Sequence, residues 1–125
     1  MTPRFDHIPV DDPRWREGAR LFNAGQFFES HEVLESLWHE VAGPDRSLLQ
    51  GLIQAAAAYH HARRNNLVGA RYLWERAERR LRSYGARHAG VALDAFRAEL
   101  AQRLRAPSST AEGPSPSIAL DVESD

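Results

Sequence analysis

Ionisable side chains recur at helical spacing within residues 27–38, which read Phe-Phe-Glu-Ser-His-Glu-Val-Leu-Glu-Ser-Leu-Trp. His31 and Glu35 are four residues apart, and on a helix this spacing puts them on one face, one turn apart. The large apolar residues of the segment fall in the same stripe, so the imidazole and the carboxylate are predicted to face the core. Buried polar groups are costly unless they are paired, hydrogen-bonded or bound to a ligand. The pattern predicts a site on this helix but names no reaction.

A second set of polar residues lies within residues 45–64, where apolar or small residues occupy nearly every direction of the expected helix. A helix that is apolar all round is typical of a central, buried position. Its polar side chains must then find partners. We expect His60 and Gln50 to meet His31 and Glu35 where the two helices pack together. The predicted polar cluster and ligand pocket comprises His31, Glu32, Glu35, Trp38, Gln50 and His60.

Three interpretations of the cluster stay open. It is a buried hydrogen-bond network that fixes helix register, or a small-molecule pocket in which Glu35 holds His31 in one tautomer for acid/base work. In the third interpretation His31, Glu35 and His60 bind a divalent metal ion that activates water, which would make the protein a hydrolase. The metal interpretation ranks last, because Glu35 stands where a zinc protease HExxH helix has its second histidine and no Glu-x-x-His pair exists in the chain.

Five helices joined by short loops are expected to position these residues. The helices are predicted by apolar residues that recur at spacings of three and four. An Asp-Pro pair marks one start, and glycine or Gly-Pro marks the ends. The expected ranges are about 12–22, 26–41, 45–64, 67–84 and 93–104. No stretch alternates as a strand does, so the fold class is all-α, a single bundle of five antiparallel helices. His88 is expected in a loop.

The chain divides into an extended N-terminal arm (1–11), the helical bundle domain (12–105) and a disordered, acidic Pro/Ser tail (106–125). It contains no cysteine, which excludes disulfides and thiol chemistry. No apolar run approaches the length of a membrane span, and no apolar segment follows a basic start as in a signal peptide. We therefore expect a cytoplasmic protein with no membrane contact.

Charge is segregated along the chain despite a net charge of −1. All sixteen basic residues are Arg, and residues 63–105 hold eleven of them against four acids. In the fourth helix Tyr72 and Leu73 are expected on the inner stripe and most arginines outside it. Nucleic-acid binding through the fourth and fifth helices ranks last among the functions, because no aromatic residues interleave the basic face.

Three blocks of the sequence resemble a known prokaryotic family, domain of unknown function 309. They are residues 22–38, 49–60 and 65–70, and the resemblance extends over about residues 14–84. It implies a small all-helical bundle built around the His-Glu-Val-Leu-Glu helix. The positions that match the family pattern are His31, Glu32, Glu35, Trp38, Gln50 and His60. Asn65 departs from the family's usual Gly-Asn turn, and the family carries no established activity.

The preferred function is a non-enzymatic binding or interaction module for a small molecule or a protein partner. Phe27 and Phe28, which follow Gly25, are expected to help dock that partner. A metal- or His/Glu-dependent hydrolase is the alternative, and nucleic-acid binding is the second alternative. No cofactor is identified beyond the divalent metal of the hydrolase interpretation.

Overall fold

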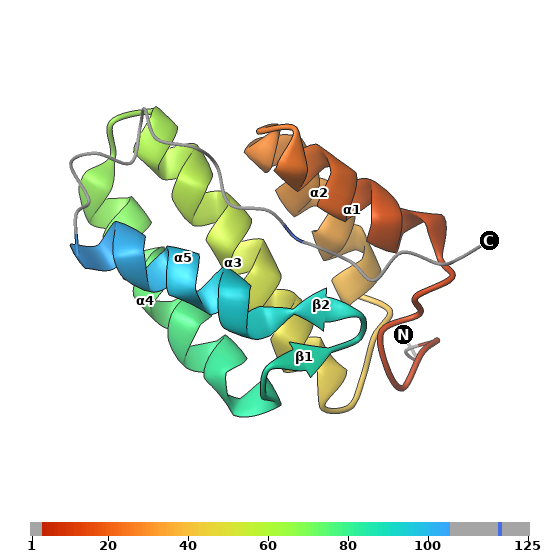
Figure 1. Cartoon of the computed structure of the whole chain (residues 1–125). Coiled ribbons are helices and arrows are strands. Elements are labelled where there is room, and N and C mark those ends of the chain that lie inside the picture. Colours follow the sequence, from red (N-terminus) through yellow and green to blue (C-terminus); the bar gives the residue numbers. More distant parts are fainter. Residues whose placement is uncertain (1–3, 106–117, 119–125) are drawn as a thin grey trace.

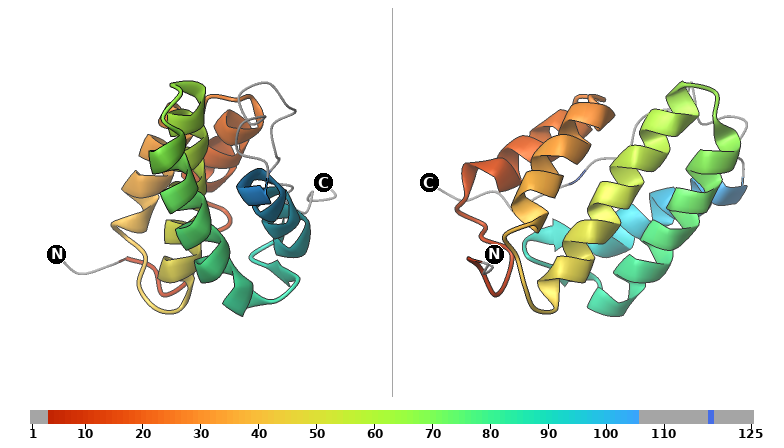
Figure 2. Two further views of the ribbon diagram at one scale, coloured as in Figure 1. Left: turned by 90° about the vertical axis from the view of Figure 1, so that its left-hand side faces the viewer. Right: turned by 180° about the vertical axis from the view of Figure 1, so that it is seen from behind.

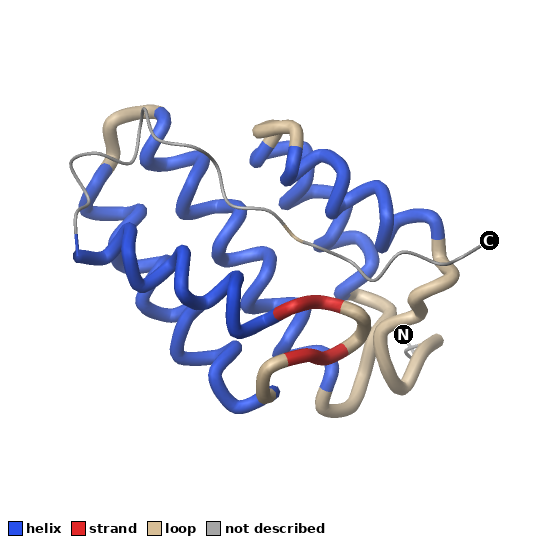
Figure 3. Tube along the Cα trace, in the orientation of Figure 1, coloured by secondary structure: helices blue, strands red, loops and turns tan. Residues whose placement is uncertain are grey.

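The computed structural model describes residues 4–105 and 118, and its secondary structure is almost entirely helical (Figures 1 and 3). The α-helices of this part are α1 (Pro13–Asn23), α2 (Phe27–Trp38), α3 (Asp45–Arg63), α4 (Leu67–Leu81) and α5 (Leu93–Arg105). A 3₁₀ turn, η1 (Arg82–Tyr84), follows α4, and a short antiparallel hairpin of β1 (Arg87–His88) and β2 (Val91–Ala92) precedes α5. The predicted all-α class with five helices is confirmed. No helix among the described residues has the length and apolar character needed to cross a bilayer.

The helices form two layers, seen from the side in the left-hand view of Figure 2. One layer holds α2, α3 and α4, and the other holds α1 and α5. α3 is the central helix, because it packs against both α2 and α4. Residues buried on α3 point in nearly every direction around its axis, as expected from its sequence.

Aromatic side chains fill the space between the two layers. The ring of Phe22 on α1 lies 5.0 Å from that of Phe27 and 5.5 Å from that of Phe96, measured between centroids. Tyr59 on α3 lies 5.2 Å from the buried Trp74 of α4. Edge-on and tilted ring pairs of this kind add to the stability that apolar burial supplies.

A glycine lets α1 and α2 approach closely. A Cβ atom at Gly18 would lie only 2.3 Å from Cδ2 of Leu34, so no larger residue fits without a shift. The buried Ser30 hydroxyl donates a hydrogen bond to the Gly18 carbonyl oxygen at 2.8 Å. This contact orients α2 about its axis, with Ser30 and Leu34 toward α1 and other residues left to face α3.

The N-terminal arm and the hairpin differ from the expectations. The prolines of residues 1–11 predict an extended arm that runs over the surface, but Ile8 is fully buried, and its backbone N–H donates to Oδ2 of Asp45 at 2.9 Å. His88, expected in a loop, lies in β1, and its Nε2 donates to Oδ1 of the same carboxylate at 2.6 Å. Phe5 forms a parallel bridge with Val41. Asp45 therefore joins the arm, the start of α3 and the hairpin.

Smaller corrections concern α2, α4 and the C-terminal residues. α2 ends at Trp38 instead of near residue 41, and the buried Val41 lies beyond it. Tyr72, expected on the inner stripe of α4, is 54% exposed. The predicted tail lies outside the described residues except for Ile118, which is buried and exchanges two backbone hydrogen bonds with the side chain of Asn23.

Replacing Asp45 by alanine tests whether this carboxylate holds the arm to the bundle. Asp45→Ala leaves the buried Ile8 N–H without its acceptor, and we expect the free energy of unfolding to fall by about 1–3 kcal/mol. Urea unfolding followed by circular dichroism measures the change. His88→Ala is the control, because it removes only a partly exposed partner and should cost less than about 1 kcal/mol. Equal losses in the two variants would contradict this role of Asp45.

Candidate functional site

A hollow of about 260 Å³ lies where α2 packs against α3. Phe28 and His31 of α2 line it together with Ala57, His60 and His61 of α3. We call this feature the imidazole hollow, because three of its five lining residues are histidines. It is slightly smaller than the pockets that hold drug-sized ligands, so it suits a compact ligand.

The half-exposed ring of Phe28 lies against two of the imidazoles. It is 46% exposed, and its centroid is 6.0 Å from that of His31 in a stacked arrangement with an interplanar angle of 28°. The centroid of His60 lies 5.3 Å from that of Phe28 at 44°. Phe28 and His31 are neighbours because residues three apart on a helix share a face. The hollow therefore presents flat aromatic surfaces.

The imidazole of His31 carries an unpaired polar atom. Its Nδ1 is buried and has no hydrogen-bond partner among the described residues. Most buried polar atoms in proteins are paired, and leaving one unpaired costs about 1–3 kcal/mol. A ligand atom that pairs with this nitrogen would offset that cost.

The turn between α3 and α4 holds His61 in one tautomer. Oδ1 of Asn66 accepts a hydrogen bond from the Gly69 N–H at 3.0 Å, which orients the amide. The Asn66 Nδ2 group then lies 3.2 Å from Nδ1 of His61. An amide NH₂ can only donate, so Nδ1 of His61 accepts and its proton is assigned to Nε2.

His60 is held in its neutral form by its surroundings. Burial lowers the pKa of its imidazole, and the positive charge of Arg64 lowers it further. His61 and His31 act in the same direction, whereas Glu29 opposes them weakly. The pKa of His60 therefore lies below the ordinary value of 6.5, so its imidazole is uncharged at neutral pH.

The structure brings only part of the predicted cluster together. His31 and His60 meet across the α2–α3 contact, as expected, but Glu32 and Glu35 are exposed. Gln50 does not line the hollow. The expected pairing of the Glu35 carboxylate with His31 is absent from the hydrogen bonds of the described residues, so Glu35 does not set the tautomer of that imidazole.

Trp38 lies away from the imidazole hollow. Its ring packs against the ring of His39 at 5.2 Å, and the Arg46 guanidinium lies 3.6 Å from its centroid. The ring thus takes part in a cation–π contact at the end of α2. It does not line the hollow with His31 and His60.

The described residues do not bring His31, Glu35 and His60 together as metal ligands. No group of three or more His, Asp or Glu residues in this part of the chain is arranged to hold a metal ion. The physical reason is that Glu35, the expected carboxylate ligand, points into solvent.

Ala57 and His61 were not predicted as site residues, and Phe28 was expected to help dock a partner but not to lie in the polar cluster. Two spacings could have indicated them: Phe28 precedes His31 by three residues, and Ala57, His60 and His61 stand at positions i, i+3 and i+4 of one helix face. Chemically, the lining groups offer aromatic surfaces, imidazole nitrogens that donate or accept hydrogen bonds, and a methyl group. They include neither a hydroxyl, a thiol nor a carboxylate.

Comparison with known proteins connects this geometry to a family. No curated protein sequence matches the chain. A family model described as "Domain of unknown function (DUF309)" matches residues 15–73, which include α2, α3 and every residue that lines the imidazole hollow. That description names no activity, so the match bears on fold and residues but on no reaction. The match confirms that this chain resembles the DUF309 family.

Proposed function

We propose that the chain is a non-enzymatic binding module that takes a small, planar, uncharged heteroaromatic ligand in the imidazole hollow. The observation that carries the proposal is the half-exposed Phe28 ring lying against His31 and His60 beside an unpaired buried nitrogen. In this proposal the module works in the cytoplasm of a prokaryotic cell.

The shape and chemistry of the lining favour a flat ligand. Aromatic rings bind other rings by offset or edge-on contact, which adds to the apolar area removed from water. The imidazole of His60 is neutral and offers no charge to pair with a ligand, and the nearby Arg64 would repel a cation. Both features favour an uncharged ligand. A ligand with both a ring N–H and a ring nitrogen acceptor can pair with either tautomer of His31.

Binding is better supported than hydrolysis or a purely structural network. A hydrolase needs a nucleophile, a metal-bound water or an oriented base. The lining residues include no hydroxyl, thiol or carboxylate, the described residues hold no set of metal ligands, and the imidazole that Asn66 orients, His61, carries its proton on Nε2 and so cannot act there as a base. A structural network needs its polar atoms paired with one another. Nδ1 of His31 has no such partner in the described residues.

Indazole, a neutral bicyclic compound with one N–H donor and one nitrogen acceptor, is a suitable probe. We expect the full chain to bind it with a dissociation constant on the order of 1 mM, the range of a compact fragment. Phe28→Ala should weaken binding about tenfold, because the ring contact is lost. Isothermal titration calorimetry measures both constants.

Tyr72→Ala is the matched control, because Tyr72 is also a half-exposed helical aromatic residue but lies outside the hollow. It should leave indazole binding unchanged. His31→Leu replaces the imidazole by an apolar side chain of similar volume. It should leave the free energy of unfolding within about 1 kcal/mol of the wild type while weakening indazole binding. A large loss of stability with unchanged binding would instead support the structural network.

Acid should weaken the binding of indazole. The pKa of His60 is lowered by burial, so its stabilising effect on the fold is complete above about pH 6.5 and is lost as the pH falls below that value. Protonated His60 places a positive charge in the hollow. We therefore expect the dissociation constant of indazole to rise as the pH falls below about 6.5, once His60 begins to take up a proton.

His60→Gln provides the control, because an amide does not titrate in this range. Its affinity for indazole should vary less with pH than that of the wild type. If both proteins show the same pH dependence, His60 is not the group that controls binding.

A further inference from the structure

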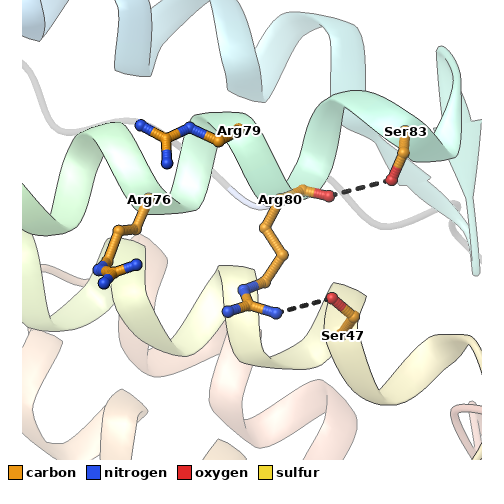
Figure 4. A pocket seen from close by; sticks show the side chains of 5 residues that line it. All are labelled: Ser47, Arg76, Arg79, Arg80 and Ser83. Carbon is orange, nitrogen blue, oxygen red and sulfur yellow. Dashed lines mark hydrogen bonds between the residues drawn. The ribbon is translucent and has the colours of Figure 1, made fainter.

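A second hollow, of about 330 Å³, lies between α3 and α4 (Figure 4). Its lining residues are Ser47 of α3, Arg76, Arg79 and Arg80 of α4, and Ser83 of the following turn. In Figure 4 the side chains of Arg76 and Arg80 extend from α4 toward α3. We call this feature the arginine hollow. It shares no residue with the imidazole hollow.

Among residues 4–105, no carboxylate pairs with the positive charges of this hollow. None of its three guanidinium groups forms an ion pair with a described residue. Other arginines nearby are paired: Glu78 accepts hydrogen bonds from Arg82 and, at 2.9 Å, from Arg97. Three guanidinium groups that form no ion pair with a described residue, placed around one hollow, attract anions strongly.

Two of the guanidinium groups are held in place by neutral contacts. Nη1 of Arg80 donates to the Ser47 hydroxyl at 2.9 Å, and Nε donates to Oε1 of Gln54 at 3.3 Å. The guanidinium of Arg76 lies 4.6 Å from the ring centroid of Tyr72. These contacts orient the groups and leave their charge available.

The Ser47 hydroxyl adds a donor to the hollow. It accepts from Arg80 and donates no hydrogen bond to a described residue, so its proton is available for a ligand. Guanidinium groups pair two N–H bonds with two oxygens of a phosphate group. A hydroxyl donor beside them completes a set of contacts for a tetrahedral oxyanion.

We propose that the arginine hollow binds a phosphate group, with Arg76, Arg80 and Ser47 as its principal donors and Arg79 supplying further positive charge. The volume of the hollow is large enough for two linked phosphates. The group belongs either to a small phosphorylated compound or to the backbone of a nucleic acid. Binding here is independent of the imidazole hollow and of any ligand bound there.

Inorganic pyrophosphate is the probe, titrated into the full chain at about 50 mM salt, where charge contacts are weakly screened. We expect a dissociation constant below about 1 mM. Arg76→Gln should weaken binding at least about tenfold, because one bidentate contact is lost. Arg80→Gln should do the same, but Arg80 also joins α3 to α4, so the exposed Arg76 provides the decisive variant.

Arg71→Gln is the matched control. Arg71 is an exposed arginine of the same helix and does not line the hollow, so its loss should change pyrophosphate affinity less than about twofold if binding is local. Equal effects of Arg76→Gln and Arg71→Gln, or no binding of pyrophosphate by the wild type, would overturn the proposal.

A single-stranded oligonucleotide of about ten nucleotides separates the two sources of phosphate. Fluorescence anisotropy measures binding of the labelled oligonucleotide. If this binding requires Arg76, weakens as the salt concentration rises and is competed by pyrophosphate, the ligand is a nucleic-acid backbone. If pyrophosphate binds and the oligonucleotide does not compete with it, the ligand is a small phosphorylated compound.

Discussion

The burial of α3 between α2 and α4 determines how the other helices pack around it. Close packing on both sides requires small residues where the backbones approach. A Cβ atom at Gly51 of α3 would lie 2.8 Å from Cδ2 of Leu81, and Ala55, Ala56 and Ala58 are fully buried. The polar residues of α3 then lie at the margins of these contacts. Both hollows form there, one beside α2 and one beside α4.

Most of the helical framework could be predicted from the sequence because its signals are local. Asp12 and Pro13 start α1 as expected, and Gly25 with φ of 81° follows its end. The hairpin could not be predicted, since strands of two residues are too short to show alternation. The burial of Ile8 depends on Asp45, which lies 37 residues further along the chain. Such a contact has no signal in local spacing.

The candidate site was only partly predictable for the same reason. Helical spacing places His31 and Glu35 on one stripe, but it does not say which part of that stripe a neighbouring helix covers. The contact between Ser30 and Gly18 decides the orientation of α2. As a result His31 faces α3, whereas Glu35 faces solvent. The arginines of α4 were expected outside the core, yet their position beside Ser47 follows only from the packing of α4 on α3.

Both proposals together give α3 two separate binding sites, one on each of its two sides. Backbone amide shifts in ¹⁵N-labelled full chain, recorded by NMR during addition of indazole and then of pyrophosphate, test this arrangement most directly. We expect two sets of perturbed amides: around Phe28, Ala57 and His60 for indazole, and around Ser47, Arg76 and Arg80 for pyrophosphate. Overlapping sets, or shifts spread evenly over the surface, would contradict it.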